Sequence, residues 1–312
     1  MVSLSQNPTG ESSGASSEDG KIENGRAAKT TISAVSDEDL SRDLRKDPDA
    51  RVAFLAIFTA DEEKAIMRKV DRRVLVLIGL MFMVKNICFG NASVIRTMQV
   101  GEPTNILTEL GMTLDDYNWV ATAQGIPYII FELPSNLLLK YMTPHAFESR
   151  IFVTWGIAIA CCGAVKTAGQ LYACRFLVGM FEAGMFPGII TTLSYWYRTD
   201  EVGRPMLWYF WIANLSSIIG SLICYGASFM DGLRNMGGWR WAFILEGVGT
   251  VLFAAAIYLI LPDFPKSLRS RSWLTPREQQ FLEARLPPNA PATADPSWDT
   301  KEAWVAFKSP TV

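Results

Sequence analysis

Long apolar segments dominate the middle of this 312-residue chain, and polar segments flank them at both ends. Six of the apolar segments approach the roughly 20 residues that a helix needs to cross the hydrocarbon core of a bilayer. Because lipid offers no hydrogen-bond partners, such a segment must satisfy its own backbone groups and therefore forms a helix. The pattern predicts membrane helices at residues 74–95, 118–139, 151–168, 171–195, 206–230 and 241–262. We therefore expect an all-α integral membrane protein with a six-helix bundle over residues 74–262.

The flanking segments are expected to fold only in part. Residues 1–59 are rich in Ser, Gly and acidic side chains, so they bury too little apolar surface to offset chain entropy and should form a disordered tail. A short charged helix is expected at residues 60–73, and residues 263–312 are expected to form a linker with short amphipathic helices, one of them near residues 299–308. Within this linker Thr275, Pro276 and Glu278 form the typical start of a helix.

Basic residues predict the orientation of the bundle. The side that carries both termini has 13 Lys and Arg residues in or near its loops, and the opposite side has five. Because cytoplasmic loops of membrane proteins carry the excess of positive residues, both termini are expected in the cytoplasm.

Composition argues against several other classes of protein. A net charge of −2 does not suit a nucleic-acid binder. His145 is the only histidine and there is no Cys-x-x-Cys pair, so neither a metal site nor a cofactor is expected. The five cysteines lie within apolar segments and are interpreted as small hydrophobic residues. We expect no enzyme, and we expect His145 to be a solvated loop residue.

Charged side chains within the apolar segments are the main functional candidates, because a charge inside a membrane helix is costly. Lys85 lies near the middle of the first segment and Glu182 near the middle of the fourth. Arg175 precedes Glu182 by seven residues, so both project from nearly the same helix face. We expect Lys85 and Arg175 to contact an anionic solute, and Glu182 and Glu132 to carry a coupling proton.

Each of these interpretations has a structural alternative. Lys85 and Glu182 could form a static ion pair that neutralises both charges and carries nothing, and Glu132 could serve a structural hydrogen bond. Four polar residues at depth are expected either to orient the solute or to form interhelical hydrogen bonds of about 1 kcal/mol or less. These residues are Asn86, Asn91, Gln124 and Asn214. Glu246 is expected to pair with a neighbour, and the small residues around Gly179 are expected to allow close helix packing.

Three runs of residues together resemble the signatures of a known family. They are residues 131–140 (FELPSNLLLK), 175–188 (RFLVGMFEAGMFPG) and 238–247 (GWRWAFILEG). The chain resembles, over about residues 70–265, the fungal allantoate permease family, which belongs to the anion:cation symporters of the major facilitator superfamily. The resemblance implies proton-coupled symport of a small organic anion or carboxylate-bearing solute across the plasma membrane. Residues 84–92 lack the Asp that many members carry there, which leaves acids of the second and fourth helices for proton coupling.

Members of this family resemble two six-helix halves with the solute held between them, and the chain resembles the N-terminal half. By this resemblance, helices one, two, four and five line the cavity while helices three and six face lipid. A second six-helix half or a second copy of the chain would complete the site. The alternative is a truncated, non-transporting membrane protein that acts as a sensor or an interaction partner.

Overall fold

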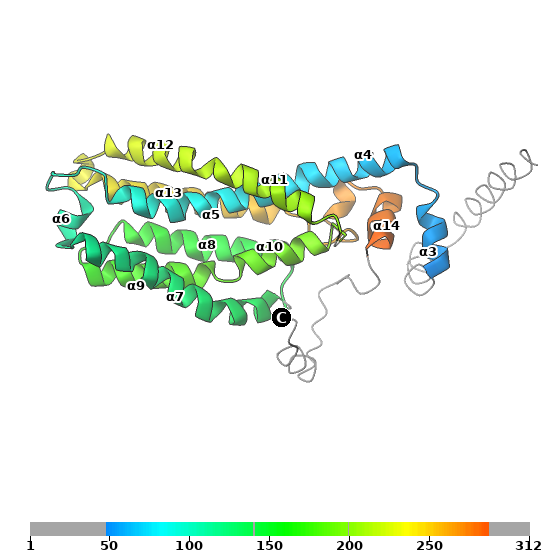
Figure 1. The fold of residues 1–312 in the computed structure, drawn as a ribbon, viewed down its shortest axis with the longest axis horizontal. Coiled ribbons are helices and arrows are strands. Elements are labelled where there is room, and N and C mark those ends of the chain that lie inside the picture. Colours follow the sequence, from blue (N-terminus) through cyan, green and yellow to red (C-terminus); the bar gives the residue numbers. More distant parts are fainter. Residues whose placement is uncertain (1–47, 140, 199, 287–312) are drawn as a thin grey trace, which may run out of the picture.

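The computed structural model describes residues 48–139, 141–198 and 200–286, and it is all-helical over these residues (Figure 1). Six long helical stretches run side by side along the long axis of the bundle. In chain order they are α5 (Val76–Ile95), α7 (Leu114–Leu139), α8 (Pro144–Cys162), α9 (Ala168–Glu182) with α10 (Met185–Ser194), α11 (Gly203–Asn214) with α12 (Ser216–Ser228), and α13 (Gly238–Ile260). The predicted fold class, an all-α six-helix bundle, is confirmed.

Four stretches of the described chain are long and apolar enough to cross a membrane, judged by length and composition. They are Ala60–Ile95, Ala168–Ser194, Gly203–Ser228 and Gly238–Ile260. The helices α7 and α8 are not among them; α7 carries Gln124, Glu132 and Asn136 along its length. Both nevertheless belong to the same bundle, because α7 packs along α9, and α8 packs against both α9 and α13.

Shorter helices cap both ends of the bundle. The end that carries α4 and α14 is called the terminal end below, and the opposite end is called the distal end (Figure 1). The shorter elements are α3 (Pro48–Leu55), α4 (Ala60–Val70), a π-helical turn (Asp71–Leu75) that leads into α5, α6 (Ile106–Leu110), two 3₁₀ turns (Leu233–Asn235 and Ser270–Ser272) and α14 (Pro276–Arg285).

Part of the segment expected to be a disordered tail is helical. Residues 48–55 form α3, with Phe54 buried and the ring of Phe58, just beyond the helix, 4.5 Å from that of Phe281 in α14. These aromatic rings supply buried apolar surface, which explains why this part of the segment folds against α14. The remaining tail and the helix expected near residues 299–308 lie outside the described residues.

The third membrane helix begins and ends earlier in the chain than predicted, because a local start signal determines where it begins. The helix α8 begins at Pro144 and ends at Cys162, whereas the hydrophobic pattern placed it at residues 151–168. Thr143 precedes it with an extended backbone, and Pro144 occupies the first turn, where its missing N–H group has no cost. The Thr-Pro pair was a usable start signal that hydropathy alone ignores.

The fourth membrane segment is broken, although the pattern predicted one continuous helix over residues 171–195. The helix α9 ends at Glu182, and Gly184 adopts a left-handed conformation with φ of 91° before α10 begins at Met185. This left-handed conformation favours glycine. The close approach of α7 also requires glycine here, because a Cβ atom at residue 184 would lie 2.1 Å from the hydroxyl oxygen of Ser135. The break therefore lies immediately after one of the predicted site residues.

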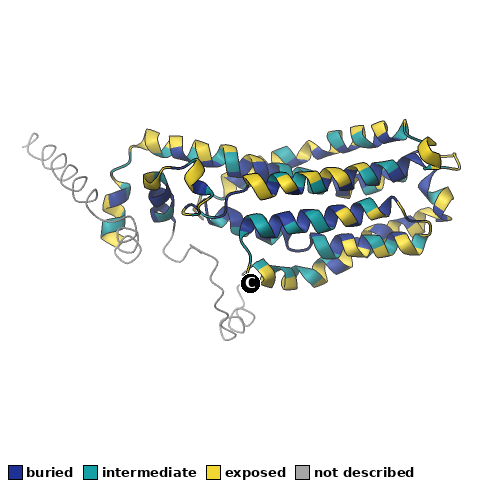
Figure 2. Cartoon of the chain, turned by 180° about the vertical axis from the view of Figure 1, so that it is seen from behind, coloured by how far each residue is buried: buried dark blue, intermediate teal, exposed yellow. Residues whose placement is uncertain are grey.

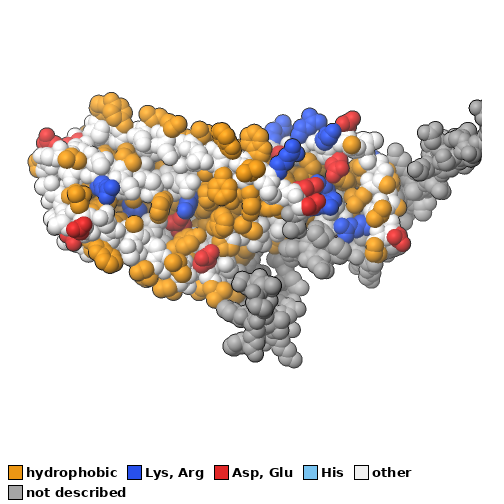
Figure 3. Space-filling model, in the orientation of Figure 1, with side chains coloured by type: hydrophobic (Ala, Val, Ile, Leu, Met, Phe, Trp, Pro, Cys, Tyr) orange, Lys and Arg blue, Asp and Glu red, His pale blue; other side chains and the backbone are white. Residues whose placement is uncertain are grey.

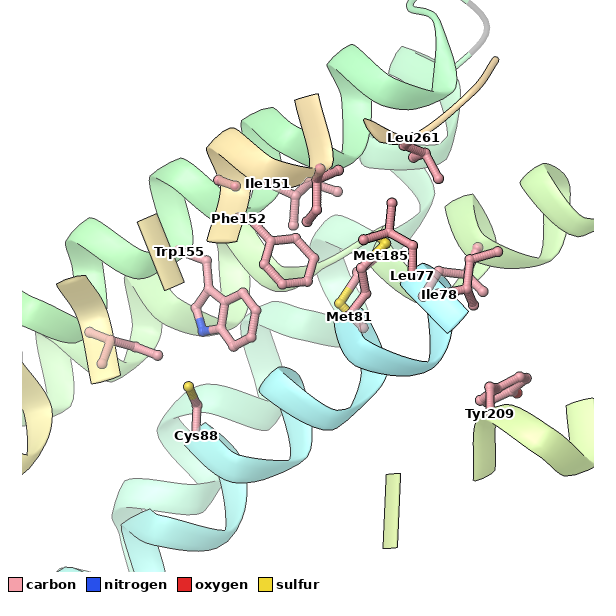
Figure 4. Close-up of a cluster of buried hydrophobic side chains, with 14 of the residues drawn as sticks. Leu77, Ile78, Met81, Cys88, Ile151, Phe152, Trp155, Met185, Tyr209 and Leu261 are labelled. Atoms are coloured by element: carbon pink, nitrogen blue, oxygen red, sulfur yellow. The ribbon is translucent and has the colours of Figure 1, made fainter. Parts of the chain in front are cut away.

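The core of the bundle lies where α5, α8 and α10 meet (Figure 4). Phe152 and Trp155 of α8 are fully buried, and Met81 of α5 and Met185 of α10 lie beside them. Flexible methionine side chains fill the irregular space between the aromatic rings. The helices α8 and α13 also pack closely against each other, since a Cβ atom on Gly247 would lie 2.5 Å from the backbone nitrogen of Ala160.

Large apolar side chains cover much of the outside of the bundle (Figures 2 and 3). Trp211 and Phe229 on the fifth membrane segment are both about three-quarters exposed, as is Ile129 on α7. Apolar surface of this extent is unfavourable in water and suits contact with lipid acyl chains. The outer face thus supports the assignment as an integral membrane protein.

Candidate functional site

Lys85 of α5 and Glu182 of α9 form an ion pair inside the bundle, with Nζ 3.7 Å from Oε1. The lysine side chain is 24% exposed, whereas that of the glutamate is only 3% exposed. The rings of Phe82 and Phe89 lie 5.8 and 5.2 Å from the ammonium group. Cation–π contacts of this kind help to hold a charge in apolar surroundings. Lys85 therefore reaches the surface of the bundle, and Glu182 anchors it from within.

Gln124 of α7 connects this ion pair to a second cation. Its side-chain Nε2 donates to Glu182 Oε2 at 2.8 Å, and its Oε1 accepts a hydrogen bond from Arg175 Nη1 at 3.3 Å. Arg175 and Glu182 lie on one face of α9, and Gly179 lies between them against the main-chain carbonyl of Gln124. Because Gly179 has no side chain, α7 comes close enough for one amide to reach both charged groups.

Arg175, which is expected to contact the solute, is deeply buried. It is 1% exposed, and its guanidinium lies 4.9 Å from the ring centroid of Phe243 in α13. Among the described residues, its Nε and Nη2 atoms have no hydrogen-bond acceptor. Unsatisfied buried donors are costly, so these two N–H donors remain available for a hydrogen bond to a new acceptor. The structure places Arg175 inside the bundle, bonded to Gln124, rather than on the exposed face beside Lys85.

A second buried polar pair joins the first and sixth membrane helices. Asn91 of α5 donates a hydrogen bond to Oε1 of Glu246 in α13, and both side chains are buried. Gly220 of α12 leaves room for the amide, since a Cβ atom there would lie 2.4 Å from Asn91 Oδ1. Arg175 is close enough to interact electrostatically with Glu246. Glu246 thus pairs with a neighbour as expected. The sixth membrane helix therefore contributes to the polar network, although the resemblance implied that this helix faces lipid.

Among the described residues, no hydrogen bond joins two of the predicted solute contacts, Asn86 and Asn214, to the network. Asn86 follows Lys85 directly and is half-buried. Asn214 is exposed on the fifth membrane segment, where its Nδ2 donates to the carbonyl of Phe210 in its own helix at 2.8 Å. The structure therefore leaves Asn214 on the outer surface of the described bundle.

Glu132, the second predicted proton carrier, lies toward the terminal end of α7. It is half-buried and one helical turn from Tyr128. The Tyr128 hydroxyl interacts electrostatically with both Glu132 and Glu182. Glu132 is therefore separate from the ion pair, and Tyr128 is within electrostatic range of both acids.

His145 is not a solvated loop residue, so this expectation was wrong. It lies in the first turn of α8, where its Nδ1 is 2.5 Å from Oδ1 of Asp263, beyond the end of α13. The ring also packs 5.1 Å from that of Tyr258. The pair joins two helix ends that are 118 residues apart in sequence, and no local pattern could have signalled it.

The network contains equal numbers of basic and acidic side chains. Lys85 and Arg175 supply two cations, and Glu182 and Glu246 supply two acids. An anion that enters alone would leave an uncompensated charge in a site of low dielectric constant, which is strongly unfavourable. An anion that enters with a proton would keep the sum unchanged.

The fold and this buried polar network agree with one family in particular. The family model of the Major Facilitator Superfamily matches residues 72–311, which is most of the chain. The chain belongs to the Major Facilitator Superfamily. Membership accounts for buried charges in an otherwise apolar bundle, since members of this superfamily are transporters whose solute sites lie near the bilayer midplane.

Several transporters are similar to this member of the superfamily. MFS transporter prlL of a fungal species is 30% identical over 229 residues, which is 73% of this chain and 46% of that protein. A putative tartrate transporter of Agrobacterium vitis is 28% identical over 227 residues, 72% of this chain and 48% of that protein. The putative metabolite transport protein NicT of Pseudomonas putida is 34% identical over 181 residues, 55% of this chain and 41% of that protein. The chain spans about half the length of these relatives.

A solved structure supports the fold. The bacterial homologue of the human lysosomal transporter Spinster, in an inward-facing and occupied conformation, superposes with a TM-score of 0.50. The match covers 64% of this chain and 46% of that one at 16% identity. At this level of identity, the similarity concerns the fold alone.

Proposed function

We propose that this chain forms the N-terminal six-helix half of a secondary active transporter of the allantoate permease type, which moves a small organic anion together with a proton by alternating access. The ion pair between Lys85 and Glu182 carries the proposal. Membership of the Major Facilitator Superfamily supports transport as the activity. The name of one relative, which refers to metabolite transport, supports a small solute, and the name of another, which refers to tartrate, supports carboxylate groups on it.

The proposed mechanism is a competition for the Lys85 ammonium group. While Glu182 is ionised, it holds Lys85 at 3.7 Å and no free cation faces the solute. A proton on Glu182 removes that negative charge, and the ammonium group then becomes available to a solute carboxylate. Binding of the anion in turn favours the protonated form of Glu182, so each ligand supports the other. Gln124 and Arg175 keep the Glu182 carboxyl group in position.

The remaining predicted residues complete the proposed path. Asn86 and Asn214 orient the solute, with Asn214 on the wall that a second half or a second copy of the chain would cover. Asn91 holds Glu246 beside the network. Glu132 receives the proton on the terminal side, and Tyr128 is within electrostatic range of both Glu132 and Glu182. We place both termini in the cytoplasm, because the excess of basic residues lies at the terminal end. The resemblance to the allantoate permease family supports the plasma membrane as the location.

Uptake of labelled small carboxylates, tartrate among them, tests the proposal in cells that express the chain either as paired copies or joined to a second six-helix half. Lys85→Ala should abolish uptake at normal surface abundance, because it removes the cation that the solute needs. Glu182→Gln should abolish proton-driven uptake but retain exchange of solute across the membrane, because Lys85 stays permanently free. Lys166→Ala, in the loop between α8 and α9, is the matched control and should transport normally.

Two results would contradict this mechanism. Unchanged uptake by Lys85→Ala would remove the lysine from the site, and unchanged proton coupling in Glu182→Gln would remove the glutamate. A chain that reaches the cell surface but neither binds nor moves any carboxylate would favour the non-transporting alternative, a membrane sensor or interaction protein.

A further inference from the structure

A pocket of about 380 Å³ opens at the terminal end of the bundle, between the start of α5 and the end of α13. It has one basic side and one apolar side. Lys69 of α4 and the arginines 72 and 73 of the following π-helical turn form the basic side, and Val76, Ile260 and Trp273 belong to the apolar side. This pocket is separate from the Lys85 site, and the proposed function makes no use of it.

Two of the three cations in this pocket are uncompensated. Lys69 is neutralised by Glu278, whose Oε1 lies 2.6 Å from Nζ. Arg72 is exposed, and Arg73 lies 5.4 Å from the ring centroid of Trp273. Within the part of the chain that the structure describes, no carboxylate lies within salt-bridge distance of either arginine. The pocket therefore presents a net positive charge to its surroundings.

The pocket lies where the apolar surface of the bundle begins. Val76 is the first residue of α5 and Ile260 is the last of α13, and each is 44% exposed. Figure 3 shows Lys and Arg side chains gathered over α4 beside the apolar surface of the helices. This is the depth of lipid headgroups, where tryptophan and arginine side chains commonly lie. A soluble anion would use the basic side alone, whereas a lipid would use both sides.

We propose that this pocket binds an anionic phospholipid from the leaflet at the terminal end. The phosphate group lies between Arg72 and Arg73, and an acyl chain runs along Val76 and Ile260. Basic pockets at the cytoplasmic ends of membrane helices select anionic headgroups for this reason. The bound lipid would tie the entry of the first helix to the exit of the sixth.

Lipid titration of the purified chain tests this site. Native mass spectrometry in a neutral detergent, with added phosphatidylserine or phosphatidylcholine, should show one saturable site that prefers phosphatidylserine. Arg72→Gln combined with Arg73→Gln should weaken phosphatidylserine binding about 25-fold at low salt, since each surface-proximal cation contributes about a fivefold factor. Replacing both residues by Lys should retain most of the affinity, which shows that the charge rather than a folding defect is responsible.

The matched control removes the same charge outside the pocket. Lys64→Gln combined with Arg68→Gln changes two exposed residues of α4 and should weaken binding far less. An equal loss in both double variants would overturn the proposal, because it would indicate diffuse surface attraction. Equal affinity for the two lipids, or equally strong binding of inorganic phosphate alone, would also overturn it. Trp273→Ala keeps both arginines and should weaken lipid binding without raising phosphate binding.

Discussion

Gly179 of α9 lies directly against Gln124 of α7: a Cβ atom at residue 179 would lie 2.0 Å from the main-chain oxygen of Gln124. The side chain of the same Gln124 bridges Arg175 and Glu182, which flank Gly179 on one helix face. Small residues are known to let membrane helices approach in this way. The contact between the two backbones is therefore what brings an amide within reach of a buried cation and a buried acid.

Substitution of Gly179 should separate α7 from α9. Gly179→Ala is expected to destabilise the bundle by about 3 kcal/mol, because the obstructing atom belongs to the backbone and cannot rotate away. Thermal unfolding in mild detergent measures the effect. Gly169→Ala is the control in the same helix, where an added Cβ meets nothing within 4 Å, and it should cause no loss. Similar effects of the two substitutions would show that the close approach is unimportant.

The ion pair of Lys85 and Glu182 should be replaceable for stability but not for transport. Lys85→Met alone leaves a buried carboxylate without its cation and is expected to cost about 2 kcal/mol. Adding Glu182→Met should recover most of that loss, because apolar pairs often replace buried ion pairs without penalty. Unfolding of both single variants and the double variant forms the cycle. If the two losses simply add, the residues are not coupled.

Arg285 should hold the linker helix α14 against the bundle. Its buried guanidinium donates from Nε to Glu63 at 3.2 Å and from Nη2 to both carboxylate oxygens of Glu201 at 2.5 Å. Arg285→Ala is expected to lower the free energy of unfolding by about 1–2 kcal/mol, since it leaves both partners unpaired. Arg198→Ala breaks the pair with Asp200, whose side chains are 47% and 65% exposed, and should cost about 0.5 kcal/mol or less. Equal losses of unfolding free energy in the two variants would show that Arg285 does not hold α14 against the bundle.

The start of α14 should make stability depend on pH. Burial tends to raise the pKa of Glu278, but hydrogen bonds from Lys69 and Thr275 outweigh it and hold this pKa below its ordinary value of about 4.3. The folded state therefore binds this proton less readily than the unfolded state, and the stabilisation is present above that ordinary value. It is lost as the pH falls through the lowered pKa.

Thermal unfolding between about pH 6 and pH 3 checks this expectation. Glu278→Gln should flatten the acid limb of the curve and lower the unfolding temperature at neutral pH, because Lys69 loses its partner. Glu102→Gln, at an exposed loop position, should leave the curve unchanged. A curve for Glu278→Gln with the wild-type slope would contradict the assignment.

Several local features were recognisable in the sequence, and others were recognisable but overlooked. The capping box of Thr275 and Glu278 indicates where α14 begins, because a cap depends only on residues three positions apart. Thr143 and Pro144 mark the start of α8 in the same way. The break after Glu182 had weaker signals, since glycines occur in continuous membrane helices as well. Its position depends on Ser135 of the neighbouring helix, which no local pattern reveals.

A bundle of apolar helices with a few charged residues inside could be predicted from the chain alone, since length, hydropathy and the cost of unpaired backbone groups are local properties. Which polar groups meet became clear only from the packing of the helices. Gln124 reaches Glu182 across 58 residues, and Asn91 reaches Glu246 across 155. Such contacts depend on the rotation of each helix about its axis. In a membrane the inner and outer faces of a helix are both apolar, so the periodic signal that sets this rotation in water-soluble proteins is largely missing.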